Sequence, residues 1–107
     1  MLIELHYIFC PDDYLLNINQ QFLHHNYYTD IISFDLSGNK GLSGEIYISI
    51  DRLIENAEKY KTPYSNELYR LVFHGALDLC GYKDKTIREK KLMRDKEDFY
   101  LMLYSKI

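Results

Sequence analysis

The pattern of apolar and polar positions along the chain predicts three strands. β-Branched and aromatic residues are concentrated in Leu2–Phe9, just before Cys10-Pro11, and indicate a first strand. Ile31–Leu36 and the alternating segment Glu45–Ile50 form two further runs, separated by the turn residues Ser37-Gly38-Asn39-Lys40-Gly41. Two strands on either side of a short Gly/Asn turn predict a hairpin.

Helical spacing predicts two helices before residue 61. Asp12 is expected to cap the first, which runs to about Leu23, and Asp51 the second, which runs to about Tyr60. The first helix is expected to bury one apolar side, formed by Leu15, Leu16, Ile18, Phe22 and Leu23.

Two more helices are expected in the second half of the chain. Thr62-Pro63 has the form of an N-cap and a first helical residue, because proline has no backbone donor to lose there. That helix is expected to reach about Cys80 and to stop at a left-handed Gly81. Thr86 with Glu89 forms a capping-box pattern that opens a last helix toward Lys106.

Length and composition favour one α+β domain over residues 1–107, a small mixed sheet packed with helices. The chain is 47% hydrophobic, enough to bury a core without disulfide or metal support. Cys10 and Cys80 lie far apart and are interpreted as reduced, partly buried thiols. The N-terminus lacks the cationic region of a signal peptide, and no apolar run approaches the roughly 20 residues that span a bilayer. We expect a cytoplasmic protein without a membrane partner.

Charge is distributed unevenly, although the net charge is only -3. The segment 83–96 has seven basic and three acidic residues, whereas the remaining chain has six basic and thirteen acidic residues. Such asymmetry can focus an anionic ligand at one end of a domain, but it is also typical of a solvated helix with alternating charges.

The helix from Pro63 to Cys80 is apolar after its first turn, and its polar exceptions share one stripe. Arg70, His74 and Asp78 follow at intervals of four residues. A His and an Asp one turn apart can present two ligand atoms to one cation, and Asp84 after the Gly81 turn can supply a third. The spacing alone favours a surface ion-pair ladder, because charged pairs four residues apart are common on helices.

Three longer blocks of the sequence resemble those of a known protein family. The segment His74-Gly75-Ala76-Leu77-Asp78-Leu79-Cys80-Gly81-Tyr82-Lys83-Asp84 resembles the signature of the YbeY family of metal-dependent endoribonucleases, His-Gly-x-Leu-His-Leu-x-Gly-Tyr followed by Asp-His. Tyr28–Phe34 is similar to that family's Pro-Thr-Asp-Val-Leu-Ser-Phe stretch, and Leu42–Ser49 to its Leu-Gly-Asp-Ile-x-Ile-Ser strand. Glu67-Leu68 leads into the site helix, and Met93 with Glu97 falls where the closing helix begins.

The resemblance implies a fold, a site and an activity. The fold is a mixed sheet with a metal-bearing helix like that of zincins, and the metal, zinc by resemblance, is held at the positions of His74, Asp78 and Asp84. The activity is cleavage of single-stranded RNA in 16S rRNA maturation and ribosome quality control, which makes rRNA and the ribosome or a ribosomal protein the expected partners. The catalytic group expected is metal-bound water.

The chain departs from the family pattern in four places. Asp78 replaces the second His, Asp84 stands where the third is usual, and Leu23 stands where many members have an Arg implicated in catalysis. Relatives usually have a strand and a helix before Leu2–Phe9, and their lack is expected to expose core or a sheet edge. Two carboxylates make a harder site, at which manganese or magnesium competes better with zinc.

Three functions follow as hypotheses. The first is metal-assisted phosphodiester cleavage, with phosphates held by Arg70, Lys83, Lys85 and Arg88. The second is a weakened or inactive homologue that docks on rRNA or a ribosomal protein, which Leu23 and Asp78 favour. The third is a metal hydrolase with another substrate, but helical peptidase motifs generally place Glu beside the first His, where this chain has Gly75.

Overall fold

The computed structural model describes residues 2–39 and 41–104 of the chain. Lys40 of the expected turn and Lys106, the expected end of the last helix, therefore lie outside the described residues. The α+β class and the mixed sheet are confirmed. The elements in order are β1 (Leu2–Cys10), α1 (Asp12–Leu23), β2 (Ile31–Asp35), β3 (Gly41–Ser49), α2 (Ile50–Tyr60), α3 (Tyr64–Leu79) and α4 (Ile87–Tyr104).

The sheet has the strand order β1-β3-β2, so the last strand in sequence lies in the middle. β2 and β3 pair antiparallel, from Ile31 opposite Ile48 to Asp35 opposite Gly44, which confirms the predicted hairpin. The expected bounds of its second strand are wrong, because β3 already begins at Gly41 of the expected turn and Ile50 belongs to α2. β1 pairs with β3 in parallel, because α1 and β2 intervene and return the chain in the same direction. The central strand is consequently covered on both edges and on both faces.

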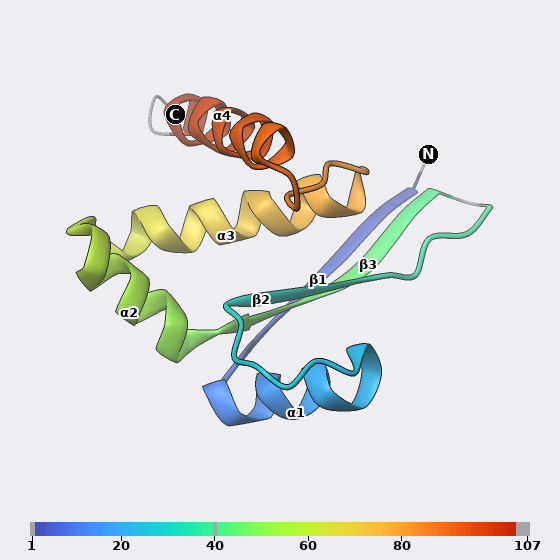
Figure 1. The fold of residues 1–107 in the computed structure, drawn as a ribbon. Helices are drawn as coiled ribbons and strands as arrows, with labels where there is room; N and C mark the ends of the chain where they lie inside the picture. The colour runs from blue at the N-terminus through green and yellow to red at the C-terminus, as the bar shows by residue number, and fades with distance from the viewer. Residues whose placement is uncertain (1, 40, 105–107) are drawn as a thin grey trace.

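Alternate residues of the sheet face different helices. Ile46 and Ile48 of β3 are fully buried and pack with Leu53 of α2 and Leu71 of α3. On the other face, Ile32 of β2 packs with Leu15 and Ile18 of α1. Figure 1 shows α1 on one side of the sheet, α3 on the other, and α4 packed on α3 away from the strands. The site helix is thus held between the sheet and α4.

α3 packs closely on the sheet at Gly75. A Cβ atom at this position would lie 2.7 Å from Cγ2 of Ile46, closer than real Cβ atoms come, and 3.2 Å from Cδ1 of Ile31, which is a tight contact. Glycine therefore permits the close contact between helix and sheet. This close contact also sets the distance between the neighbouring His74 and the strands.

Two expected helix caps are wrong, for one shared reason. Asp12 and Asp51 lie inside the first turns of α1 and α2, where negative charge favours the helix dipole. The Asp12 carboxylate instead accepts hydrogen bonds from Arg52 and from the Ser49 hydroxyl, and Asp51 accepts one from the Asp12 backbone N–H. Ser49 is the actual cap of α2, because its hydroxyl accepts from the Arg52 N–H. These contacts tie the starts of α1 and α2 together.

The starts of the last two helices differ in how well the sequence predicts them. α3 begins at Tyr64 with Pro63 as its N-cap residue, and the Thr62 hydroxyl, expected to be the cap, is buried without a hydrogen-bond partner. The capping box of α4 is confirmed: the Glu89 N–H donates to Oγ1 of Thr86 at 3.1 Å, and the Thr86 N–H donates to Oε1 of Glu89 at 2.9 Å. Gly81 adopts the expected positive φ, at 99°.

The expected apolar side of α1 is only partly buried. Leu15 and Ile18 belong to the core, but Phe22 is 64% and Leu23 40% exposed. Phe22 packs edge to face on Phe34 of β2 with its outer side open, and Asn19 is buried instead, where its Nδ2 donates to the Tyr27 carbonyl. Cys80, expected to be partly buried, is exposed, whereas Cys10 is buried.

Within residues 2–39 and 41–104, no helix combines the length and the apolar character needed to cross a membrane.

Candidate functional site

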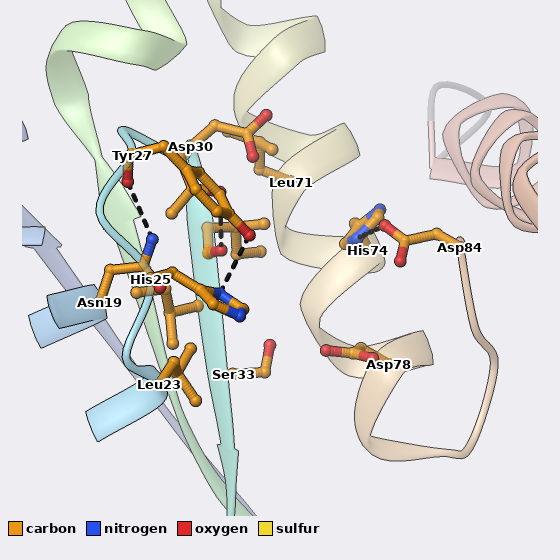
Figure 2. A pocket seen from close by; sticks show the side chains of 13 residues that line it. Asn19, Leu23, His25, Tyr27, Asp30, Ser33, Leu71, His74, Asp78 and Asp84 are labelled. Carbon is orange, nitrogen blue, oxygen red and sulfur yellow. Dashed lines mark hydrogen bonds and ion pairs between the residues drawn. The ribbon is translucent and has the colours of Figure 1, made fainter. Parts of the chain in front are cut away.

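The three predicted ligand residues come from α3 and from the loop that follows it. His74 and Asp78 stand one turn apart on the helix, as their spacing predicts. The chain turns at Gly81 and brings Asp84 back beside His74, with 3.3 Å between Nε2 of His74 and Oδ2 of Asp84. Figure 2 shows all three side chains on the α3 side of one pocket. The structure therefore places the three residues in one site.

α4 supplies the other partner of His74. Nδ1 of His74 donates to Oε2 of Glu97 at 2.6 Å, and Nη1 of Arg70 donates to the second carboxylate oxygen, Oε1, at 3.0 Å. Arg70 also pairs with Asp98 at 2.7 Å. Arg70 and His74 thus point to α4, so the stripe is not a surface ladder of pairs within α3.

Glu97 is the functional residue that sequence reasoning missed. The sequence placed it, with Met93, where the closing helix begins and gave it no role, but that placement is wrong, because Glu97 lies in the second half of α4. It is buried, and both of its oxygens are occupied by Arg70 and His74. Its four-residue spacing from the buried Met93 is the signal that could have indicated an inward-facing position.

A cavity of about 430 Å³ opens between α3 and the loop that leads into β2. His74, Asp78 and Asp84 line one wall. The opposite wall comes from the end of α1, the following loop and β2, and includes Leu23, His25, Tyr27, Asp30 and Ser33 (Figure 2). Leu23 thus reaches the cavity, but its aliphatic side chain offers no proton or charge there.

His25 and Asp30 are additional polar groups that motif spacing did not single out. The ring of His25 stacks on Tyr27 with centroids 5.1 Å apart, and its Nδ1 shares a 3.0 Å hydrogen bond with the Tyr27 hydroxyl. Asp30 accepts a hydrogen bond from Asn56 of α2. Both lie far from His74 in sequence, so only the packing of the loop against α3 reveals them.

Burial and mutual charge shift the pKa values around the cavity. Burial opposes the charged form of His74, but the hydrogen bond and charge of Glu97, with help from Asp84 and Asp30, outweigh it and raise its pKa. Burial raises the pKa of Asp30 despite the nearby His74. Burial, followed by the charge of Asp84, raises the pKa of Asp78, while the charge of His74 partly offsets this. All three groups hold protons more tightly than usual.

Two of the three expected ligands of this cavity are spaced as donors to a divalent cation would be. Two donors about 2.0–2.1 Å from a tetrahedral ion lie roughly 3.3 Å apart, which is the separation of His74 and Asp84. Glu97 holds the other imidazole nitrogen, as a carboxylate does behind a metal-bound His. The Ser33 hydroxyl, on the opposite wall, is buried without a hydrogen-bond partner. Even so, no three His, Cys, Asp or Glu side chains among the described residues are gathered closely enough to hold an ion as they stand.

The four residues predicted to hold RNA are placed differently from one another. Arg70 is largely buried in its pairs with Glu97 and Asp98. Lys83, Lys85 and Arg88 are exposed on the loop and at the start of α4, and none of them lines the cavity. Their role in RNA binding stays a prediction.

Comparison with known proteins gives a consistent result. Residues 1–105 match the family described as Endoribonuclease YbeY. The chain is 54% identical to Endoribonuclease YbeY of Flavobacterium psychrophilum over 101 residues, which cover 94% of this chain and 72% of that protein. It is 54% identical to Endoribonuclease YbeY of Cytophaga hutchinsonii over 103 residues, covering 95% and 72%. The solution structure of TM1509 from Thermotoga maritima superposes with a TM-score of 0.67 at 30% identity, covering 94% of this chain and 67% of that one.

Proposed function

The chain belongs to the YbeY endoribonuclease family, and from this membership we propose that it cleaves single-stranded RNA with the help of a divalent metal ion. The proposal places it in the cytoplasm, in the processing of ribosomal RNA and in ribosome quality control, with the ribosome or a ribosomal protein as partner. One observation carries the proposal: His74 stands between Glu97 and Asp84 at the wall of an open cavity lined by further acidic groups.

His74, Asp78 and Asp84 are the residues that would hold the ion. When bound, such an ion supplies Lewis-acid polarisation of the phosphodiester and activation of water. One imidazole and two carboxylates would accept zinc, which is the metal that the resemblance to the family implies. The two carboxylates also make the donor set hard enough for manganese or magnesium.

The protein's own groups have two tasks in this reaction. Glu97 accepts a hydrogen bond from Nδ1–H of His74 and thereby leaves the lone pair on Nε2, at the cavity, while Arg70 holds Glu97 in place. Asp30 faces the same cavity with a raised pKa, which suits a group that takes up a proton during attack and returns it to the leaving oxygen. Asp30 is therefore the candidate general base.

The direct test is cleavage of a labelled single-stranded RNA with and without a chelator. We expect cutting of the single strand, loss of cutting with chelator, and recovery on adding back zinc or manganese. His74→Ala should abolish cutting, whereas His6→Ala, at an exposed histidine paired with Glu4 on β1, should not. Equal cutting with and without chelator would exclude the metal role, and equal cutting of duplex RNA would exclude the single-strand preference.

A second candidate function is RNA docking by a weakened homologue. Leu23 supports it, because this side chain occupies the cavity wall without offering charge or a proton. Asp78→His distinguishes the two functions. A large gain in cleavage would identify a weakened enzyme, whereas absence of cleavage in both forms, together with intact RNA binding, would favour docking.

A further inference from the structure

A second cavity of about 300 Å³ lies on the other side of His74, against α4. It shares Asp30, Leu71, His74 and Asp84 with the first cavity, so the two meet at the candidate ligands. Its remaining wall includes Tyr60 of α2 and several charged residues of α3 and α4. An extended chain bound across His74 would therefore have a place on both sides of it.

Two basic side chains of α4 line the second cavity, Lys90 and Arg94. They stand one helical turn apart and are both exposed. Among the salt bridges of residues 2–39 and 41–104, neither takes part in one, whereas their neighbour Lys91 pairs with Asp95 at 3.1 Å. Lys90 and Arg94 are therefore cationic groups available to a ligand.

The acidic groups of the same cavity do not cancel this charge. Glu97 is engaged by Arg70 and His74. Glu67 is buried, and its burial raises its pKa, although the charges of Arg70 and Arg94 oppose the shift. The two remaining carboxylates of this cavity also have partners, Asp30 in Asn56 and Asp84 in His74. The negative groups thus lie buried or paired, while the cations lie exposed at the opening, where an anion would approach.

The first cavity offers a different kind of contact. Tyr27 is 56% exposed and carries the ring of His25 stacked on it at an interplanar angle of 19°. Flat, exposed rings of this kind accept unpaired bases by stacking. One cavity therefore suits a base and the other a backbone phosphate, with the candidate ligands between them.

We propose that Lys90 and Arg94 form a phosphate-binding subsite for the RNA strand, beside the phosphodiester that is cleaved. The inference rests on the proposed function, because it takes single-stranded RNA as the ligand. Lys90 acts as a point charge and Arg94 as a two-pronged donor to phosphate oxygens. The strand then crosses His74 with its cleaved linkage at the junction of the two cavities.

Binding of a short fluorescent single-stranded RNA by the full chain tests the subsite independently of cleavage. Lys90→Gln/Arg94→Gln should weaken binding by about tenfold at low salt and flatten the plot of log K against log salt by roughly 0.7 for each phosphate that is no longer neutralised. The matched control is Lys91→Gln/Lys96→Gln, which removes two charges from the same helix outside both cavities. An equal decrease in affinity in both double variants would overturn the proposal, since it would reduce the effect to net charge.

A strand with one uncharged methylphosphonate linkage locates the subsite on the RNA. Moved along the RNA, this linkage should weaken wild-type binding at one position beside the cleaved bond and should have no further effect there in Lys90→Gln/Arg94→Gln. Lys90→Gln alone keeps Arg94, whose charge also acts on Glu67. In this variant the uncharged linkage should weaken binding at the same position, but by a smaller factor. An unchanged pattern in both variants would also overturn the subsite.

The two proposals fail in different ways. If the Lys90/Arg94 variant loses position-specific binding while no form of the protein cleaves RNA, the subsite stands and the proposed activity falls. If metal-dependent cleavage persists and the variant binds and cuts like the Lys91/Lys96 control, the activity stands and the subsite falls.

Discussion

Nδ1 of His74 and Oε2 of Glu97 lie 2.6 Å apart, and this contact joins the two helices that build the site. Glu97 is 4% exposed, and its other oxygen accepts from Arg70. One buried carboxylate thus orients the candidate ligand on α3, holds the neighbouring arginine and fastens α4 to α3. If His74 holds the proposed ion, ion binding and helix packing are coupled through this single side chain.

Glu97→Gln is expected to weaken both properties. The amide cannot accept two charged donors equally well, so we expect a loss of about 2–3 kcal/mol in the free energy of unfolding. Removing the carboxylate behind His74 should also lower zinc affinity about 10–100-fold. Urea unfolding and competitive zinc titration measure the two effects. Asp95→Asn, at an exposed carboxylate paired with Lys91, is the control and should change neither; unaltered zinc affinity in Glu97→Gln would refute the orienting role.

Gly75→Ala tests the close packing of α3 on the sheet. Alanine favours a helix over glycine by about 1 kcal/mol, but its Cβ would meet the fully buried Ile46 at 2.7 Å. Overpacking of this kind costs about 1–3 kcal/mol, so we expect net destabilisation and a displaced His74. Thermal unfolding measures the first effect and zinc affinity the second.

The control for this substitution is Gly38→Ala. A Cβ at position 38 meets no atom within 4 Å, so the melting temperature should stay the same. If Gly75→Ala were instead more stable than the wild type, α3 would be free to move away from Ile46, and the contact would not fix the height of His74.

The sequence predicts the strands, the hairpin and the capping box because each of them depends on local spacing. It places α3 for the same reason, and with it His74 and Asp78. The two wrong helix caps show where local spacing no longer suffices. Asp12 and Asp51 are residue types that cap helices, but their carboxylates accept hydrogen bonds that join α1 to α2. Glu97, His25 and Asp30 reach the site only through packing between distant segments, which a one-dimensional pattern does not contain.

The stability of the metal-free protein is expected to fall as pH rises above about 6. His74, Asp30, Glu67 and Asp78 all have pKa values raised above their ordinary values of 6.5, 3.8, 4.5 and 3.8, so the folded state binds their protons more tightly than the unfolded state. The contribution of His74 is complete below 6.5 and is lost as pH rises through its folded pKa. Those of the carboxyls are complete below their unfolded values and are lost in the same direction.

Urea unfolding in chelator at pH 5.5 and pH 8 measures this difference. The protein should be more stable at pH 5.5, and His74→Gln should flatten the dependence between these values. Added zinc should reverse the trend, because its ligands must lose their protons before they bind. Equal or greater stability at pH 8 in chelator would show that the raised pKa values do not hold in the folded protein.

Thr86→Val tests whether the capping box of α4 positions the loop that carries Asp84. The substitution keeps the shape of the side chain but removes the oxygen that accepts from the Glu89 N–H, and loss of such a cap costs about 0.5–2 kcal/mol. Because Asp84 lies only two residues before Thr86, fraying of this turn should also weaken zinc binding. The matched control is Thr62→Val, since the Thr62 hydroxyl is buried without a partner and its removal should leave stability equal or slightly higher. Unfolding and zinc titration of the two variants side by side decide the point: equal zinc affinity in both would mean that Asp84 is held by His74 alone.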